Sequence, residues 1–573
     1  MKILFEGHKY KSNSLAPILP GTYFKTHDDK DCPTHVGYFF SKQIGESVFI
    51  LPKVFLDARE HFMGIVYPED LFSLTFTDLN RKYKHRYDQI LSSLAIFIYQ
   101  AIYKYKEQSE GSMSDDAEVP IVFSNHHRKK HESLLEIYIS IISFYEKHKN
   151  LITYISKISH TGRKIKWAKT IASKQPIIVD NIPIYLAAIA SRNKINYNEI
   201  LIILLYSVLN YFKNIFGFNF EYNLNYELIK GNSFRRLLDG KGALYLKSIK
   251  NKYFRDEFIQ LWELLYAFFD LSKRIENSEN YEDILMCSNF NLLFEEMVDS
   301  LICDDTDHIP RYYSDQKDGK RVDHLFSYLD LLNDKKIFYI GDSKYYMPDA
   351  TIKGESLEKQ YTYAKNIIDY NIRDLIRHKE AKSKRYDVWY RDNLTEGYNI
   401  TPNFFILGVV IPPRISDHLI SNLDFLHPNL QFKDIQEHRQ FENRLFDRDT
   451  LVVLTYEINF LFVLTSYISR CEISKTKFRR QVRDDIRKRN IDILNSKYLF
   501  YEFIFDDTNQ RSEFIKANFK SLIGKVYIKY QSARGLVLAL ENLEKFSIEN
   551  NEVLNLFRGI KKFSDADSFR IRL

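Results

Sequence analysis

The sequence predicts a multidomain α/β protein built around one mixed sheet flanked by helices. Its 573 residues are enough for several domains with their own cores. A buried-strand pattern at 337–340 lies between two segments with helical apolar spacing, 289–302 and 356–368, and a second buried-strand pattern follows at 403–411. Strands that alternate with helices along the chain favour the α/β class.

Four regions are expected along the chain. Short apolar runs punctuated by Pro and Gly predict a β-rich N-terminal domain at 1–80. Helical spacing predicts a mainly helical domain at 81–280, in which a polar segment near 107–119 is expected to be a mobile surface loop. The mixed-sheet core is assigned to 281–415, and 416–573 is expected to be a C-terminal α/β extension with a basic helix.

The elements of the core each have a local signal. The first helix carries Phe290, Phe294, Met297 and Leu301 at helical spacing. The second helix is expected to begin at Ser356, since serine is a common N-cap residue. The strand at 403–411 is closed by two prolines. Further on, 451–464 predicts a buried strand followed by a core helix, and we expect no transmembrane segment there.

Polar side chains follow the strand at 337–340 directly. Asp342 and Lys344 are two residues apart, so in a strand they project from the same face. Asp323 follows a turn signal at 317–320, where Asp-Gly is typical of a hairpin. The two carboxylates could hold a hard divalent cation such as Mg²⁺. Lys344 could then orient or deprotonate a water and offset charge on a phosphate.

An isolated Asp-x-Lys pattern is usually a solvated strand end with an ion pair, because charged side chains are mostly exposed. The order of the surrounding elements favours a functional interpretation here. Helix, strand, strand with Asp-x-Lys, helix and strand follow one another, and this order resembles the αβββαβ core of the PD-(D/E)xK nucleases.

Local sequence blocks narrow this resemblance to the LlaJI-type restriction endonucleases, which are relatives of McrC. The matching blocks are Leu293–Glu295, Asp318–Lys320 with Val322–His324, Ile340–Tyr346, Lys359–Asn366 and Gly162–Thr170. The resemblance implies an endonuclease that uses Mg²⁺, or Mn²⁺, to hydrolyse phosphodiester bonds in double-stranded DNA.

The resemblance also assigns roles to residues of this chain. Asp323 and Asp342 fall on the metal-ligand positions, Lys344 on the position that acts at the attacking water, and Glu295 on the acid of the preceding helix. Gln360 falls where related nucleases carry a supporting helix glutamine.

The sequence departs from the family pattern in two places. Val322 stands where the family often has proline before the first aspartate. Ala364 stands where the Gln-x-x-x-Tyr pattern would require tyrosine, which weakens the assignment of Gln360.

Partners follow from the same resemblance. In that family the nuclease subunit works beside a separate McrB-like AAA+ NTPase, and associated DNA methyltransferases are possible further partners. No G-x-x-x-x-G-K-[ST] motif occurs in this chain, so NTP hydrolysis is assigned to another polypeptide. Two alternatives stay open. One is a non-catalytic assembly subunit that binds and stimulates the NTPase, and the other is a nuclease acting on RNA or on particular nucleic-acid structures.

Charge is compatible with a nucleic-acid partner. The 82 Lys and Arg residues against 75 Asp and Glu give a formal net charge of +7. The predicted basic helix at 474–489 could track a phosphate backbone or simply form a solvated helix exterior. Its candidate DNA contacts are Lys477, Arg479, Arg480, Arg483 and Arg487.

Cysteine usage and the N-terminus point to the cytoplasm. The four cysteines are scattered without a CxxC pair, which supports neither a zinc ribbon nor a disulfide framework. The first residues lack the apolar core of a signal peptide. We therefore expect a cytoplasmic protein that has no contact with a membrane.

Overall fold

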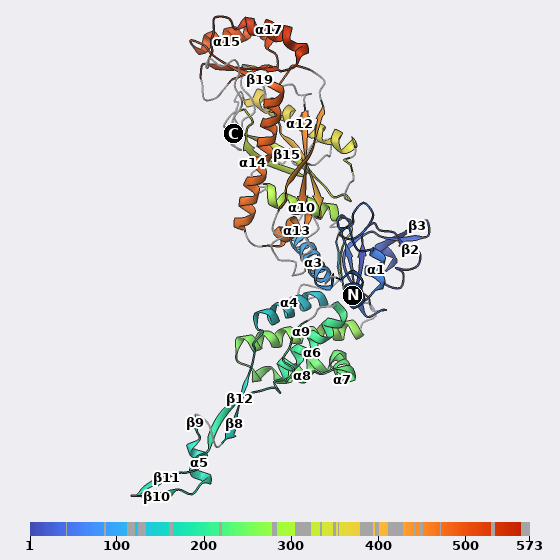
Figure 1. Cartoon of the computed structure of the whole chain (residues 1–573), viewed down its shortest axis with the longest axis vertical. Coiled ribbons are helices and arrows are strands. Elements are labelled where there is room, and N and C mark those ends of the chain that lie inside the picture. Colours follow the sequence, from blue (N-terminus) through green and yellow to red (C-terminus); the bar gives the residue numbers. More distant parts are fainter. Residues whose placement is uncertain are drawn as a thin grey trace.

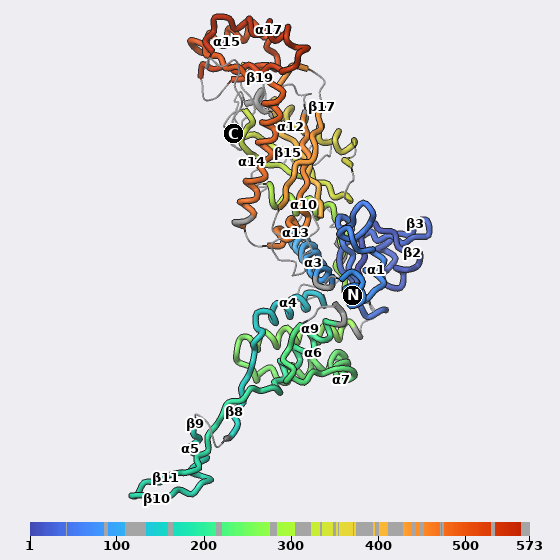
Figure 2. Tube along the Cα trace, in the orientation of Figure 1, coloured from blue at the N-terminus to red at the C-terminus, as the bar shows by residue number. Residues whose placement is uncertain are grey.

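The computed structural model describes most of the chain and shows an elongated molecule (Figure 1). The N-terminal domain lies beside the middle of the molecule, a thin arm projects from one end, and the C-terminal domain forms the other end (Figures 1 and 2). The described residues are 1–41, 43–84, 87–111, 121–123, 133–159, 164–216, 220–277, 283–303, 322–332, 335–347, 351–352, 354–378, 394–395, 400–410, 428–438, 442–445, 451–469, 472–528 and 533–562.

The N-terminal domain is built on a five-stranded sheet with the order β1-β6-β5-β13-β7. Its strands are β1 (Lys2–Phe5), β6 (Glu46–Leu51), β5 (Val36–Ser41), β13 (Ile284–Cys287) and β7 (Ile121–Phe123). A small sheet accompanies it, formed by β2 (Tyr10–Lys11), β4 (Lys30–Pro33) and β3 (Phe24–His27). Helices α1 (Pro68–Ser73) and α2 (Phe76–Tyr83) follow.

The predicted boundaries at 80 and 281 are corrected by this sheet. Strand β13 pairs with β5 on one side and with β7 on the other, although both β13 and β7 lie after residue 80. All four residues of β13 are apolar and buried, so the strand is stabilised by burial inside this sheet.

A helical region follows through α3 (Tyr87–Gly111). Its other helices are α4 (Leu134–Lys147), α6 (Ile200–Phe216), α7 (Gly231–Arg236), α8 (Gly242–Ile249) and α9 (Asp256–Asn277). The predicted loop near 107–119 is partly wrong, because α3 continues to Gly111 through the helix-compatible residues Glu107 and Gln108. Residues 112–119 lie outside the described residues.

A β-arm interrupts the mainly helical region of 81–280. Its elements are β8 (Tyr154–Ser159), β9 (Lys164–Ile165), α5 (Trp167–Ser173), β10 (Ile177–Val179), β11 (Ile182–Ile184) and β12 (Ala190–Ile195). Strands β10 and β11 form a hairpin whose two turn residues, Asp180 and Asn181, both have positive φ, as a tight hairpin turn requires. The arm projects away from the helices (Figure 1). Its apolar side chains are unusually exposed; Ile178 and Leu186 are 69% and 80% exposed.

The central domain is a five-stranded mixed sheet with the order β14-β15-β16-β18-β17. Its strands are β14 (His324–Leu329), β15 (Lys336–Lys344), β16 (Asn403–Val409), β18 (Leu451–Asn459) and β17 (Gln431–His438). Strand β15 pairs antiparallel with β14 and parallel with β16. Strand β18 pairs parallel with β16, so the sheet extends beyond the predicted boundary at 415. The prediction of a strand followed by a core helix at 451–464 is confirmed by β18 and α13 (Phe460–Ile468).

Helices cover both faces of this sheet. Helix α12 (Gly354–His378) packs Tyr361 and Ala364 against Phe338 and Ile340 on one face. Helices α10 (Phe290–Ile302), α13 and α14 (Glu472–Lys497) cover the other face. As predicted, α10 buries Phe290, Phe294, Met297 and Leu301. Helix α12 begins at Gly354, two residues before the predicted N-cap Ser356.

A small C-terminal domain follows α14, which runs along the central sheet toward it (Figure 1). Its four-stranded sheet has the order β20-β21-β19-β22, with β20 (Val526–Tyr527), β21 (Gly535–Glu541), β19 (Tyr498–Ile504) and β22 (Lys561–Lys562). Helices α15 (Thr508–Ala517), α16 (Phe519–Leu522) and α17 (Ser547–Leu556) complete the described part. Across the described helices, none combines the length and the hydropathy needed to span a bilayer.

Candidate metal centre

Two aspartates face each other where β14 begins and β15 ends. In the β14–β15 ladder His324 lies opposite Gly341, so the same register places Asp323 opposite Asp342. Their carboxyl groups are hydrogen-bonded to each other. Lys344 lies on the same face of β15 as Asp342 and forms an ion pair with its carboxylate. The structure thus brings together the three side chains singled out in the sequence.

Glu295 adds a third carboxyl group from helix α10. It is half-buried, and its negative charge acts on Asp323. Burial, the hydrogen bond with Asp342 and the negative charges of Asp342 and Glu295 together raise the pKa of Asp323 far above its ordinary value. The structure therefore places Glu295 within electrostatic reach of the aspartate pair.

The ammonium group of Lys344 is held in its charged form. Burial disfavours the charge, but Asp342 and then Asp323 outweigh burial and raise the pKa of Lys344 above its ordinary value. Its side chain is 20% exposed, so the centre reaches the molecular surface at this point.

Close packing beneath the centre depends on Gly341. A Cβ atom at this position would lie 2.2 Å from Cε2 of the Phe404 ring on the neighbouring strand β16. The absence of a side chain lets the Phe404 ring lie directly against β15, one residue before Asp342. Any larger residue at 341 would push apart the two strands that carry the centre.

These donors fit a hard divalent cation. Asp323, Asp342 and Glu295 offer carboxylate oxygens, which are the ligands that Mg²⁺ and Mn²⁺ prefer. Three carboxylate groups against one ammonium group would leave a surplus of negative charge. A bound dication would remove that surplus.

Gln360 lies near this sheet but makes a structural contact. Its side chain is fully buried, and Nε2 donates a hydrogen bond to Oδ1 of Asn403 at 2.6 Å. Nδ2 of Asn403 in turn donates to the backbone oxygen of Gln360 at 3.1 Å. Because Asn403 is the first residue of β16, this pair fastens α12 to the strand beside β15.

Some of the DNA contacts predicted on the basic helix are wrong, because those arginines bond within the protein. Helix α14 is present, but Arg483 is buried and donates twice to the backbone oxygen of Ile302. Arg479 donates to the oxygens of Ser300 and Leu301. These two guanidinium groups therefore satisfy carbonyls at the C-terminal end of α10.

A third arginine among the predicted DNA contacts also forms a hydrogen bond inside the protein. Arg487 is buried and donates to the backbone oxygen of Asp330. Lys477 and Arg480 are exposed and remain candidate phosphate contacts.

Sequence reasoning missed a link between this centre and the N-terminal domain. Tyr345, which follows Lys344, is buried, and its hydroxyl bonds with Glu6 and with the backbone N–H of Lys53. Its ring packs against Phe290 and Phe294 of α10, the helix that carries Glu295. The Ile340–Tyr346 block gave no local signal for this contact, because its partners lie near the start of the chain.

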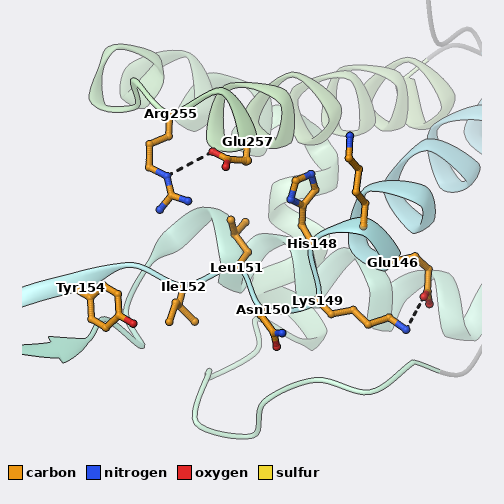
Figure 3. A pocket seen from close by; sticks show the side chains of 10 residues that line it. Glu146, His148, Lys149, Asn150, Leu151, Ile152, Tyr154, Arg255 and Glu257 are labelled. Atoms are coloured by element: carbon orange, nitrogen blue, oxygen red, sulfur yellow. Dashed lines mark ion pairs between the residues drawn. The ribbon is translucent and has the colours of Figure 1, made fainter.

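A cavity of about 570 Å³ lies elsewhere, at the base of the arm (Figure 3). Lys149 pairs with Glu146 at 2.6 Å and Arg255 pairs with Glu257 at 3.5 Å on its walls. Two lysine and arginine charges of its wall are thus paired with carboxylates of the same wall, and the cavity is separate from the carboxyl centre.

Comparisons with known proteins add little. No protein-family description matches the chain, and no curated protein matches it. Among solved structures, the chain is similar to a chain from a half-complex of Thermococcus gammatolerans McrB AAA+ hexamers with bound McrC. The identity is 11%, the match covers 84% of this chain and 99% of that one, and the TM-score is 0.27. A similarity at that level carries no argument about function.

Proposed function

We propose that the chain is the nuclease subunit of a restriction system and hydrolyses phosphodiester bonds of double-stranded DNA with Mg²⁺ or Mn²⁺. The observation that carries this proposal is the convergence of Asp323, Asp342, Glu295 and Lys344 at the end of one sheet. The order of elements that resembles the PD-(D/E)xK core supports the same assignment.

Each residue has a distinct role in this proposal. Asp323 and Asp342 would hold the cation, and Glu295 would add negative charge from the α10 side. When bound, the cation would polarise the phosphate and the attacking water as a Lewis acid.

Lys344 is assigned an electrostatic role. Because its pKa is raised, it is an ammonium group at neutral pH and cannot accept a proton from water. It would donate hydrogen bonds to the attacking water and stabilise the negative charge that builds on the phosphate. The three carboxyl groups would keep this ammonium group oriented toward the scissile phosphate.

An AAA+ NTPase subunit of the McrB kind is part of the proposal. This chain lacks a P-loop motif, and the resemblance described above implies such a partner. The arm also favours a protein partner. It exposes many apolar side chains, and exposed apolar patches commonly mark protein–protein contacts. The association with DNA methyltransferases rests on the resemblance alone.

The proposal is tested with Asp342→Asn, which keeps the shape of the side chain and removes its charge. Purified wild-type chain, together with an AAA+ NTPase subunit of the McrB kind, should cut plasmid DNA in Mg²⁺ and NTP. Asp342→Asn should lose cutting by at least about 100-fold and keep full stimulation of the NTPase. If the wild-type pair stimulates NTP hydrolysis but never cuts DNA, the chain is a non-catalytic assembly subunit.

A further inference from the structure

A second cluster of ligand-type side chains lies beside the carboxyl centre. Asp299 and Cys303 are one turn apart at the C-terminal end of α10, and His324 is the first residue of β14. The carboxylate oxygen, the thiol sulfur and the imidazole nitrogen all lie within 4.8 Å of one another.

This cluster is distinct from the carboxyl centre. His324 and Ser343 are hydrogen-bonded to each other, and they alternate along β14 and β15 with Asp323 and Asp342. Successive residues of a strand point to opposite faces. The cluster therefore lies on the α10 face of the sheet, behind the carboxyl centre.

The three donor types together select a class of metal ion. One nitrogen, one sulfur and one oxygen ligand suit Zn²⁺, whereas Mg²⁺ prefers oxygen ligands alone. In a tetrahedral zinc site with bonds of about 2.0 to 2.1 Å, nitrogen and oxygen ligands lie about 3.3 Å apart. Nδ1 of His324 and Oδ1 of Asp299 are 3.2 Å apart, so this pair already has that spacing.

The surroundings resemble those of a metal-bound histidine. Nε2 of His324 is 2.5 Å from Oγ of Ser343, so a hydrogen bond fixes the orientation of the ring. Histidine ligands of metals commonly have such a partner on the second nitrogen. His324 is fully buried, while the Asp299 side chain is 29% exposed and leaves an approach from solvent.

Burial and nearby groups act on the Cys303 thiol in opposite directions. Burial, followed by the charge of Asp299, raises the pKa of Cys303 well above its ordinary value, so the free thiol is protonated. The backbone N–H of Leu325 and the guanidinium group of Arg483 act in the opposite direction. A bound zinc ion displaces the thiol proton, which is released to solvent.

We propose that Asp299, Cys303 and His324 bind one zinc ion, with water as the fourth ligand on the side of Asp299. The ion joins the end of α10 to the start of β14. Helix α10 carries Glu295, and Asp323 directly precedes β14, so the zinc site supports the carboxyl centre from behind. The proposal does not depend on DNA cleavage, because zinc binding is measured directly.

The test uses the full-length chain. Protein is incubated with zinc sulfate, dialysed exhaustively and analysed by plasma mass spectrometry; the wild type should retain about one zinc ion per chain. Cys303→Ser and Asp299→Asn should retain at least about tenfold less zinc. Cys32→Ser is the matched control for loss of a thiol elsewhere, and it should retain as much zinc as the wild type.

A second measurement keeps the test independent of how well the variants fold. Wild-type chain loaded with Co²⁺ should show the near-ultraviolet thiolate-to-cobalt absorption that requires a cysteine ligand. Its absence, retention of zinc in Cys303→Ser, or a wild type that retains no zinc would each overturn the proposal. In that case Asp299, His324 and Ser343 form only a buried hydrogen-bonded chain.

Discussion

The hydroxyl of Tyr345 donates a hydrogen bond to Oε2 of Glu6 at 2.6 Å, although 339 residues separate the two in the chain. The hydroxyl oxygen of Tyr345 also accepts a hydrogen bond from the backbone N–H of Lys53. Burial, followed by the charge of Glu6, raises the pKa of Tyr345 well above its ordinary value, so the hydroxyl stays protonated and keeps donating. The N-terminal domain thus holds the residue next to Lys344.

Removing this hydroxyl should weaken the link between the two domains. Tyr345→Phe leaves Glu6 and the Lys53 N–H without their partner and should cost about 1 to 3 kcal/mol of unfolding free energy. We expect a lower urea midpoint and slower DNA cleavage at saturating DNA, because Lys344 is held less firmly.

Tyr456→Phe is the matched control. The Tyr456 hydroxyl is also buried in the central domain, but it has no hydrogen-bond partner among the described residues. This variant should be as stable as the wild type or slightly more stable. Equal losses in both variants would contradict the account of Tyr345.

Replacing Asp323 should have opposite effects on the stability of the metal-free chain and on metal binding. Its pKa is raised in the folded chain, so its contribution to stability is present below the ordinary value of 3.8 and is lost as the pH rises through the folded value. Asp323→Asn removes that loss. In metal-free buffer at pH 8 the variant should therefore melt no lower than the wild type, and this relative gain should disappear at pH 4.

Magnesium should reverse the order of the melting temperatures of the wild type and Asp323→Asn. Ligands stabilise the state that binds them, so Mg²⁺ should raise the melting temperature of the wild type and leave that of Asp323→Asn unchanged. Thermal scans with EDTA and with Mg²⁺ measure both effects. A variant that is less stable at pH 8 and still responds to Mg²⁺ would show that Asp323 is not a ligand.

Replacing two arginines of α14 by alanine should change the unfolding free energy by different amounts. Arg483→Ala removes both hydrogen bonds to Ile302 and the contact with the Phe326 ring, 4.4 Å from the guanidinium carbon, and should cost about 2 to 4 kcal/mol. Arg480→Ala should be nearly neutral, because its side chain is 83% exposed. Urea unfolding measures both. If Arg483→Ala is fully stable and instead weakens DNA binding in a salt-dependent way, Arg483 contacts DNA.

A buried carboxyl group in the N-terminal domain should make stability depend on pH. Asp283 accepts hydrogen bonds from the Tyr38 hydroxyl and the Leu134 N–H, and burial raises its pKa to about 7. Its contribution to stability is fully present below 3.8 and is lost as the pH rises toward 7. The loss amounts to at most about 4 kcal/mol.

Asp283→Asn removes this titration while keeping one oxygen for Tyr38. Between pH 5 and pH 8 its unfolding free energy should fall less than that of the wild type, whatever its absolute stability. Urea midpoints at the two pH values give the comparison. Parallel changes in both proteins would mean that Asp283 does not titrate in this range.

Local patterns in the sequence predicted the elements that carry the centre. Apolar spacing identified α10, and short apolar runs identified β15, β16 and β18, because these segments bury residues at the period of their own structure. The two-residue spacing of Asp342 and Lys344 placed them on one face. Their meeting with Asp323 required the β14–β15 register, which becomes clear only in the folded chain.

Other features depend on contacts that local patterns do not contain. Strand β13 belongs to the N-terminal sheet because its partners are β5 and β7, both far away in the sequence. In α14 a signal was available: Arg479, Arg483 and Arg487 recur every four residues, one step round the helix from the buried stripe of Phe478, Val482 and Ile486. That placement brings the three arginines to the edge of the core.

The central claim is that Asp323 and Asp342 hold a divalent cation, and Mn²⁺ binding followed by electron paramagnetic resonance tests it most directly. The wild type should bind Mn²⁺ at a site that Asp342→Asn loses and that Asp283→Asn, altered in the N-terminal domain, retains. If the wild type binds no Mn²⁺ at millimolar concentration, or if Asp342→Asn binds it as the wild type does, the claim is contradicted.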